Sequence, residues 1–235
     1  MFKEIKNKYL RFTIIFIYFI IIFFCALQIN FLWLFGYSPS YTDIKKPSQR
    51  VGSELYTADG KLIGRYFKEN RTPVSFNDIS KNVINALVAT EDVRFYKHTG
   101  IDIQAVGRAV VGMGKEGGAS TITQQLAKNL YRTRYNKSFG LAGRVPVVRT
   151  VVAKLKEWMT ALKLESNYSK NDIITMYLNT VSFGNNTYGI KTASRIYFNK
   201  EASQLNVPQA ALLVGMLKAT TSYNPIKNPE KSLER

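Results

Sequence analysis

The sequence predicts a mainly α-helical protein that carries a small N-terminal β-hairpin and one N-terminal transmembrane helix. From Ser75 onward, apolar residues recur at helical spacing and no second strand-rich block appears. Before that point, the stretches 54–58 and 61–67 flank Asp59-Gly60, a dipeptide typical of the turn in a two-stranded hairpin. Residues 12–35 contain no charged side chain, and roughly 20 apolar residues are enough to cross a bilayer.

The apolar segment divides the chain. It is preceded by four basic residues and only one acidic residue, so the positive-inside rule puts the N-terminus in the cytoplasm and everything after Gly36 outside. A buried core helix is the alternative interpretation. We therefore expect a cytoplasmic tail at 1–11, a transmembrane helix at 12–35, a polar linker at 36–50 and one folded domain at 51–230.

The charge of the chain limits its partners. Its 235 residues include 33 basic and 16 acidic ones, which gives a net charge of +17. A basic protein outside the membrane most simply meets anionic lipid headgroups or a phosphorylated substrate. Nucleic acid is the other interpretation, but the export signal argues against it. The single cysteine, Cys25, lies inside the apolar segment, so the exported domain has no disulfide and depends on its core.

The first helix after the hairpin ends in a pair of acids. Ser80 is a plausible N-cap, and the pattern breaks just past Glu91, with Gly100 marking a turn. At a helix C-terminus the macrodipole disfavours a second negative charge, and the neighbouring Asp92 acts in the same direction. We therefore expect a raised proton affinity for Glu91, as a general base or acid needs. A solvated helix end is the alternative. The apolar positions are Ile79, Val83, Ile84, Leu87 and Val88.

The next two segments differ in character. Residues 103–118 are small and apolar with several glycines, which favours either a mobile segment against a membrane surface or a flexible loop. A helix follows, where Thr121 and Gln124 form a capping box after paired glycines. Thr121, Gln125 and Lys128 fall together on one face, opposite the apolar residues, and would make an anion or sugar platform. A plain capped surface helix would explain the pattern equally well.

A long helix is predicted at 149–165, after a basic loop at 132–148. Its apolar stripe is Val151, Leu155, Trp158 and Leu162. We expect Glu157 to stay ionised at the edge of a cationic face, in contrast to Glu91, although charge on a helix face is often simply solvated. The opposite, polar face comprises Arg149, Lys156, Thr160 and Lys163, with Lys154 further round.

The C-terminal part reads as three more helices. Ser169 and Asp172 form a capping box for a helix that ends at Asn179. A turn-rich loop at 184–190 leads to a helix at 190–198. A last helix begins at Asn206 and runs to about Thr220. No internal repeat is present.

The only histidine, His98, is more typical of a positioning hydrogen bond than of catalysis. No cysteine stands near it outside the apolar segment, and no Ser-x-x-Lys sequence occurs. A zinc site and serine acyl-enzyme chemistry are therefore poorly supported.

Five motifs follow one another along the chain: Glu91-Asp-x-x-Phe95-x-x-His98-x-Gly100, Gly118-Ala-Ser-Thr-Ile-Thr-Gln-Gln125, Lys154-x-x-Glu157, Lys170-x-x-Ile-x-x-x-Tyr-Leu-Asn179, and Ala211-Leu-Leu-Val-Gly-Met-Leu with Tyr223-Asn-Pro225. Together they resemble the motifs of the peptidoglycan glycosyltransferases. This is the transglycosylase family of class A penicillin-binding proteins and of monofunctional enzymes. The resemblance implies a lysozyme-like fold with two lobes, a larger head and a smaller membrane-facing jaw.

The resemblance also implies a reaction, the polymerisation of lipid II into glycan strands with inversion at the anomeric carbon and loss of undecaprenyl pyrophosphate. Glu91 matches the general base, and Glu157 matches the second motif glutamate, which we take as catalytic. Lys128, Arg149 and Lys154 match positions that bind the donor pyrophosphate, and Thr121 and Gln125 match donor-site residues. The further candidates for substrate binding are Asp92, Phe95, His98, Ser120, Gln124 and Asn179.

The expected setting follows from the same resemblance. The protein would be a single-pass protein of the bacterial plasma (inner) membrane, with its catalytic domain outside and a role in cell-wall biogenesis and cell shape. Its partners would be lipid II, the growing glycan strand, the membrane and other cell-wall synthesis proteins, but not nucleic acid. No cofactor is required by the sequence, although the pyrophosphate would accommodate Mg or Mn.

Two departures from the family pattern keep alternatives open. Ala153 stands where an arginine usually precedes the third-motif lysine, and Thr220 stands where the last motif usually ends in proline. A lytic or hydrolytic glycosidase and an inactive membrane-anchored scaffold are the rival functions. The motifs fit both a monofunctional enzyme and a piece of a longer penicillin-binding protein.

Overall fold

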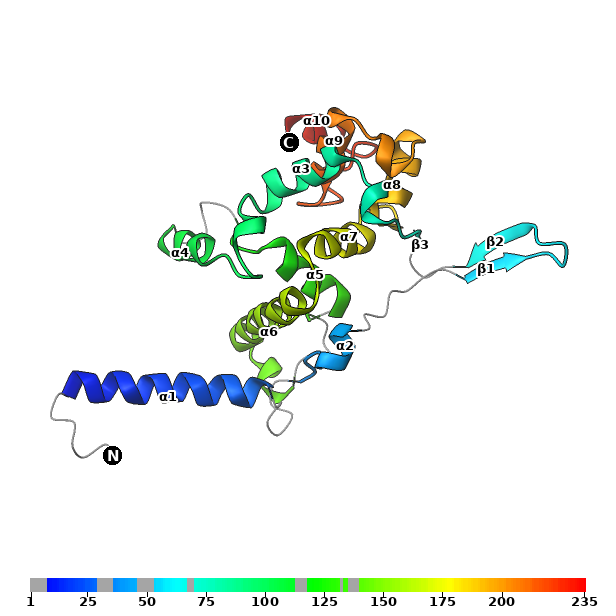
Figure 1. The fold of residues 1–235 in the computed structure, drawn as a ribbon. Coiled ribbons are helices and arrows are strands. Elements are labelled where there is room, and N and C mark those ends of the chain that lie inside the picture. Colours follow the sequence, from blue (N-terminus) through cyan, green and yellow to red (C-terminus); the bar gives the residue numbers. More distant parts are fainter. Residues whose placement is uncertain are drawn as a thin grey trace. The chain divides into compact units, whose positions relative to one another are not determined.

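A computed structural model of the chain describes residues 8–28, 36–45, 53–66, 70–112, 118–131, 133–134 and 140–235. Helices make up most of this part of the chain, so the mainly α prediction is confirmed (Figure 1). Two compact units are present. The first unit comprises residues 1–38 and 133–156, and the second unit comprises residues 39–132 and 157–235.

The first unit contains α1 (Lys8–Gln28), a 3-10 helix η6 (Leu141–Arg144) and the start of α6 (Pro146–Asn167). No helix in the described ranges combines the length and the apolar character needed to cross a membrane. The transmembrane helix predicted at 12–35 is thus not confirmed, and residues 29–35 of that range lie outside the described residues.

Helix α6 begins three residues earlier than expected and turns a different face inward. Val151 and Leu162 of the predicted apolar stripe are 51% and 45% exposed, whereas Lys156 and Glu157 are buried. Lys156 can be buried because its Nζ donates a hydrogen bond to the carbonyl oxygen of Tyr37 at 2.6 Å. Both residues belong to the first unit. The predicted loop at 132–148 therefore ends at Val145, and its residues 132 and 135–139 lie outside the described part.

Burial lowers the pKa of Lys156 to about 8. In the unfolded chain the Lys156 ammonium keeps its proton up to a pH near 10.5, whereas in the folded protein it loses the proton near pH 8. Between these pH values the unfolded state binds more protons than the folded state, so the free energy of unfolding rises with pH. We expect the wild type to gain on the order of 2 kcal/mol in free energy of unfolding relative to Lys156→Met between pH 7 and pH 10. Denaturant titrations of both proteins at the two pH values measure this gain. A constant difference between them would contradict it.

The second unit holds the main core, and most of the core residues lie on α3 (Lys81–Glu91), α5 (Ile122–Tyr131), α7 (Lys170–Thr180), α8 (Ile190–Phe198) and α9 (Val207–Met216). α3 packs against α9 and α5 against α7 (Figure 1). The caps predicted at Ser80 and Ser169 are confirmed, since Ser80 accepts from the Asn82 N–H, and Ser169 begins a complete capping box. At the box predicted for Thr121 and Gln124, the Gln124 N–H donates to the Thr121 hydroxyl at 3.1 Å, but the Gln124 side chain donates to the Gly100 carbonyl. Further short helices of the second unit are η3 (Phe76–Asp78), η4 (Phe95–Lys97), η7 (Ala202–Gln204) and α10 (Pro229–Glu234).

The predicted polar linker is in part a packed segment. Residues 41–45 form a short helix, α2 (Tyr41–Lys45), and the Ile44 side chain is fully buried in the core of the second unit. The Nζ of Lys163 donates to the Pro39 carbonyl at 3.0 Å, and the Tyr168 hydroxyl donates to the Ile44 carbonyl at 2.9 Å. Part of the predicted linker thus packs against the folded domain. Its polar composition did not indicate this, because the packing depends on one buried isoleucine.

The predicted hairpin is confirmed. Strands β1 (Ser53–Tyr56) and β2 (Leu62–Tyr66) pair antiparallel, and Gly60 in the turn has φ 79°. The sequence missed a second pair, in which β3 (Asn70–Arg71) lies parallel to β4 (Thr187–Tyr188), because two-residue strands carry no periodicity. It also missed α4 (Ile103–Val111), where a mobile segment or loop was expected. The Asp102 carboxylate accepts from the Ala105 N–H at 3.0 Å and so begins that helix.

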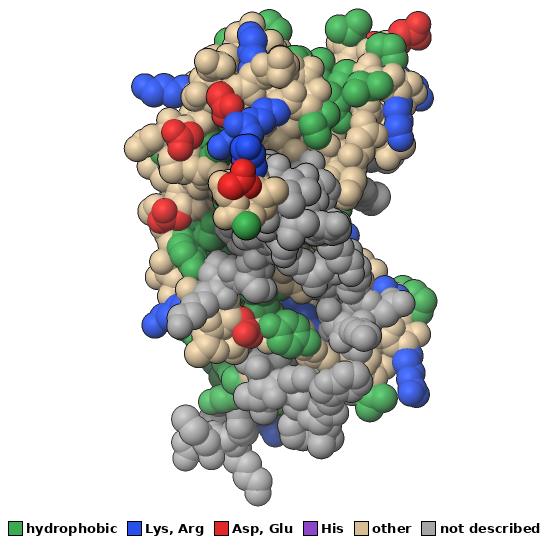
Figure 2. Space-filling view, turned by 90° about the vertical axis from the view of Figure 1, so that its right-hand side faces the viewer, with side chains coloured by type: hydrophobic (Ala, Val, Ile, Leu, Met, Phe, Trp, Pro, Cys, Tyr) green, Lys and Arg blue, Asp and Glu red, His purple; other side chains and the backbone are tan. Residues whose placement is uncertain are grey.

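In the view of Figure 2, the basic side chains of the described residues stand at several separate places and do not form one stripe.

Candidate functional site

A cleft of about 210 Å³ lies in the second unit, where the end of α3, the start of α4 and the segment before α5 meet. It brings together four of the predicted site residues, namely Glu91, Asp92, Ser120 and Thr121. The other residues that line it are Thr90, Val93, Arg94, Asp102, Ala105, Arg108, Gly118 and Ala119.

Glu91 is the last residue of α3, as predicted, and is half-buried. Its Oε2 accepts a hydrogen bond from Nε2 of Gln125 at 2.7 Å, and Oε1 of Gln125 accepts from the Tyr177 hydroxyl at 3.0 Å. No other described residue hydrogen-bonds Glu91. One carboxylate oxygen is therefore held by a side chain of α5, and Glu91 itself lines the cleft. The predicted effect of Asp92 on the proton affinity of Glu91 stays a prediction.

Asp92, which was predicted to bind substrate, uses its carboxylate for hydrogen bonds within the protein. Its carboxylate accepts from Nε2 of His98 at 3.0 and 3.1 Å and from the backbone N–H of Ile122 at 3.0 Å. Ile122 is the first residue of α5, where the helix dipole favours a negative charge. Since Nδ1 of His98 accepts from the Gly100 N–H at 3.1 Å, the ring proton lies on Nε2 and is donated to Asp92. Asp92 and His98 thus join the 92–100 loop to α5.

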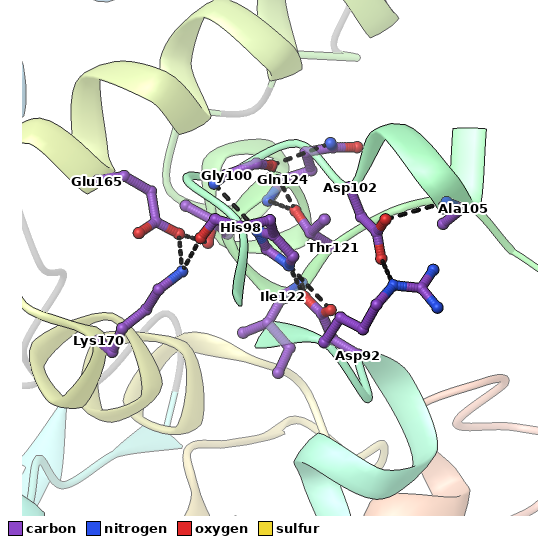
Figure 3. A network of polar contacts seen from close by, with 12 residues as sticks. Asp92, His98, Gly100, Asp102, Ala105, Thr121, Ile122, Gln124, Glu165 and Lys170 are labelled. Atoms are coloured by element: carbon purple, nitrogen blue, oxygen red, sulfur yellow. Dashed lines mark hydrogen bonds and ion pairs between the residues drawn. The ribbon is translucent and has the colours of Figure 1, made fainter. Parts of the chain in front are cut away.

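The Gly100 carbonyl accepts hydrogen bonds from Thr121, directly before α5, and from Gln124 in α5 (Figure 3). The Thr121 hydroxyl donates to it at 2.7 Å and Nε2 of Gln124 donates at 3.1 Å. Gly100 itself has φ 95°, and a Cβ there would stand 3.1 Å from the Ala161 carbonyl group, so this close approach requires glycine. Thr121 is only 2% exposed, so the predicted shared face of Thr121, Gln125 and Lys128 is wrong for Thr121. The Thr121 hydroxyl instead donates to the Gly100 carbonyl and so holds the loop.

A lysine holds the other side of the same loop (Figure 3). Nζ of Lys170 donates to the His98 carbonyl at 2.7 Å and to Oε1 of Glu165 at 2.8 Å, and that oxygen also accepts from the Thr123 hydroxyl at 2.6 Å. The same ammonium lies 4.3 Å from the centre of the Phe95 ring, which is fully buried in the core. Phe95 therefore anchors the loop in the core of the second unit.

Two arginines of the cleft were not predicted from the sequence. Arg94 pairs with Asp102 at 2.8 Å. Burial raises the pKa of Asp102, but the Ala105 N–H and the Arg94 guanidinium together hold it below its usual value. Arg108, on α4, is exposed and makes no hydrogen bond or ion pair with the described residues. The sequence signal was present, because Ala105 and Arg108 are one helical turn apart, but the glycines of this stretch favoured a loop.

The other predicted residues lie outside this cleft lining. Lys128 is half-buried on α5 and has no hydrogen bond to the described residues, whereas the Asn179 amide pairs at both ends with the backbone of Val74, at 3.0 and 2.9 Å. Glu157 is 2% exposed. Arg149 and Lys154 belong to the first unit, where both are half-buried. Within the described residues, no three carboxylate, histidine or cysteine side chains come together as a metal site.

Comparison with known proteins gives the family. A family model described as Transglycosylase matches residues 59–235. Penicillin-binding protein 1F of Bacillus subtilis is 43% identical over 197 residues, which cover 82% of this chain and 26% of that protein. Penicillin-binding protein 1A of Neisseria lactamica is 38% identical, with 83% and 23% covered, and that of Aquifex aeolicus is 41% identical, with 78% and 24% covered. The chain thus spans about a quarter of the length of these relatives.

A crystal structure of penicillin-binding protein 1A from Haemophilus influenzae was also found, with a TM-score of 0.39 and 22% sequence identity over 80% of this chain and 17% of that one. The family match covers most of the chain and includes every motif from Glu91 to Pro225. The family predicted from those motifs is confirmed, and the chain belongs to the transglycosylase family.

Proposed function

We propose that this domain is a peptidoglycan glycosyltransferase with a lysozyme-like fold, which polymerises lipid II into glycan strands and releases undecaprenyl pyrophosphate. One observation carries the proposal. Glu91 lines the cleft with one carboxylate oxygen held by Gln125, while no described residue hydrogen-bonds the other. A carboxylate fixed in this way is suited to take a proton from a bound substrate. Membership of the transglycosylase family supports this choice of reaction.

In the proposed step, the hydroxyl oxygen of the acceptor sugar bonds to the anomeric carbon of the donor. The bond from that carbon to the pyrophosphate oxygen breaks, and the pyrophosphate leaves with the bonding electrons. Glu91 takes the hydroxyl proton. Because attack comes from the side opposite the leaving group, the anomeric configuration is inverted.

The leaving group requires positive charge. In our proposal Lys128, Arg149 and Lys154 bind the donor pyrophosphate, because positioned cations stabilise the charge that develops as it departs. Glu157 is the proposed second catalytic carboxylate, and Gln125 is a proposed donor-side residue. Thr121 would act there through the loop that its hydroxyl holds at Gly100. A divalent cation would take its ligands from phosphate oxygens of the substrate, and no step above depends on it.

Arg108 adds a positive charge to the cleft that Glu91 lines. Its exposed guanidinium lines the same cleft and is suited to bind an anionic group of the substrate in bidentate fashion. We expect Arg108→Ala to raise KM for lipid II about tenfold with a smaller effect on kcat. Lys227→Ala, which removes an exposed cation near the C-terminus, is the control and should change KM less than about twofold. Equal effects of the two changes would point to diffuse attraction.

We further propose that the domain works at the outer face of the bacterial plasma membrane, next to its lipid-linked substrate. The uncharged run 12–35 and the basic residues before it support this orientation. Other cell-wall synthesis proteins are proposed partners. Protease added to intact spheroplasts should degrade the domain, and protection until lysis would contradict the proposal.

The decisive experiment supplies the purified protein with labelled lipid II and, separately, with preformed glycan. Polymer formed from lipid II is the expected result. Cleavage of the preformed glycan would instead indicate a lytic or hydrolytic glycosidase. Neither reaction, from a protein that is folded by circular dichroism, would indicate a scaffold.

A further inference from the structure

We propose that Tyr177 is a positioning residue, which fixes the orientation of the Gln125 amide and thereby decides which oxygen of Glu91 receives the substrate proton. The inference rests on the proposed role of Glu91 as general base. It concerns a side chain on α7 that does not line the cleft and makes its contact through Gln125.

Three side chains from three helices form a single line of hydrogen bonds. Glu91 ends α3, Gln125 lies on α5 and Tyr177 lies on α7. The two bonds measure 2.7 Å from Nε2 of Gln125 to Oε2 of Glu91 and 3.0 Å from the Tyr177 hydroxyl to Oε1 of Gln125. All three helices belong to the second unit, and α5 packs directly against α7.

The direction of each bond follows from chemistry. An amide has one end that donates and one that accepts, and it can turn over to exchange them. An ionised carboxylate only accepts, so it needs the NH₂ end of Gln125. A hydroxyl can donate or accept, but the pKa of Tyr177 is raised, first by burial and then by the charge of Glu91. Tyr177 therefore keeps its proton and donates it to the carbonyl end of Gln125.

The consequence lies at Glu91. Because Tyr177 holds the carbonyl end, the NH₂ end of Gln125 is committed to Oε2 of Glu91. Oε1 of Glu91 has no hydrogen-bond partner within the described residues and is the oxygen left to accept the proton of the acceptor hydroxyl. Without the tyrosine hydroxyl, the amide is held at one end only and can rotate out of line. The bond to Oε2 of Glu91 is then made less often, and the carboxylate is less well positioned to accept the proton.

The competing explanation is that Tyr177 merely fills the core, since its side chain is fully buried. Tyr177→Phe separates the two explanations because it keeps the ring and removes only the hydroxyl. We expect the rate of polymerisation to fall about tenfold through kcat, with KM nearly unchanged and the unfolding midpoint lowered only by the modest amount that the loss of one buried hydrogen bond causes. Tyr168→Phe is the matched control, because it removes a hydroxyl that donates to the Ile44 carbonyl elsewhere in the second unit. It should keep activity within about twofold of the wild type.

A double-mutant cycle gives the sharper test. In a Gln125→Met background no amide remains to be oriented, so Tyr177→Phe should cost no further activity there. An equal loss in both backgrounds would mean that Tyr177 acts on the fold and not through Gln125, and would overturn the inference. If the wild type itself makes no polymer from lipid II, the proposed function fails instead, so the two failures are distinguishable.

The pH–rate profile decides the case in which Gln125→Met is too slow to measure. The groups that face Glu91 are Gln125 and Tyr177, with Asp92 next along the chain and Arg94 and Arg108 in the cleft lining. A hydrogen bond donated to a carboxylate favours its ionised form. If Tyr177→Phe releases that bond, the acidic limb of kcat/KM moves to higher pH relative to the wild type. An unmoved limb would contradict the inference.

Discussion

Glu91→Gln is expected to abolish glycan polymerisation while the protein stays folded and still binds lipid II. The amide is nearly isosteric with the carboxylate, and its oxygen can still accept from Nε2 of Gln125, so the local structure has no reason to change. The amide cannot take a proton from the acceptor hydroxyl. General base catalysis typically supplies about 100- to 10,000-fold, and we expect a loss of that size in initial rate.

Initial rates with labelled lipid II measure the effect. Glu201→Gln is the control, because it makes the same substitution at another glutamate, whose ion pair with Arg195 is partly exposed to solvent. It should leave the rate within about twofold of the wild type. A Glu91→Gln protein that retains activity within a few-fold of the wild type would remove Glu91 from the role of base.

Asp92→Ala is expected to cost about 4 kcal/mol in free energy of unfolding. The carboxylate is almost fully buried and is the acceptor for two donors, the Ile122 N–H and Nε2 of His98. Alanine leaves both donors without their acceptor and removes the negative charge from the N-terminus of α5. Since single domains are stable by only about 5–15 kcal/mol, a loss of this size threatens the fold itself.

Denaturant titration measures this loss, and the control is Asp172→Ala. Asp172 also accepts from a backbone N–H at a helix N-terminus, that of Ser169 on α7, but this contact is exposed. We expect a cost of about 1 kcal/mol there. Asp92→Asn should lie between the two, because one acceptor oxygen remains while its NH₂ group meets the His98 N–H. If Asp92→Ala cost no more than Asp172→Ala, the carboxylate would not be holding α5.

The two variants test different parts of one arrangement. Glu91 and Asp92 are adjacent in sequence, yet their side chains bond to different partners. Glu91 accepts from Gln125, and Asp92 accepts from Ile122 and His98. Glu91 lies half-buried in the cleft, and Asp92 turns inward to α5 and His98. The loop that follows is held by Thr121 and Gln124 through Gly100, and by Lys170 through the His98 carbonyl. The position of Glu91 thus depends on residues from two other helices, α5 and α7.

Much of this protein was determined by local sequence. Ser80 and Ser169 cap their helices because a side-chain oxygen meets a free N–H one turn on, and such contacts need no distant partner. The hairpin around Asp59-Gly60 likewise depends on its own turn. The place of Glu91 at the end of α3 follows from where the apolar period stops. The family followed from five short motifs in order, and the match over residues 59–235 confirms it.

Only the tertiary structure decided what the side chains contact. Ile44 is a core residue, and Lys156 is buried against a backbone carbonyl more than 100 positions before it in sequence. Helical periodicity gave α6 the wrong inner face because it scores a lysine as solvated, while a single carbonyl acceptor allows it to be buried. The bonds of Asp92 to His98 and Ile122, the placing of Arg108 in the cleft that Glu91 lines and the line from Tyr177 through Gln125 all join residues separated along the chain. Such contacts form only when helices pack, so no local pattern in the chain records them.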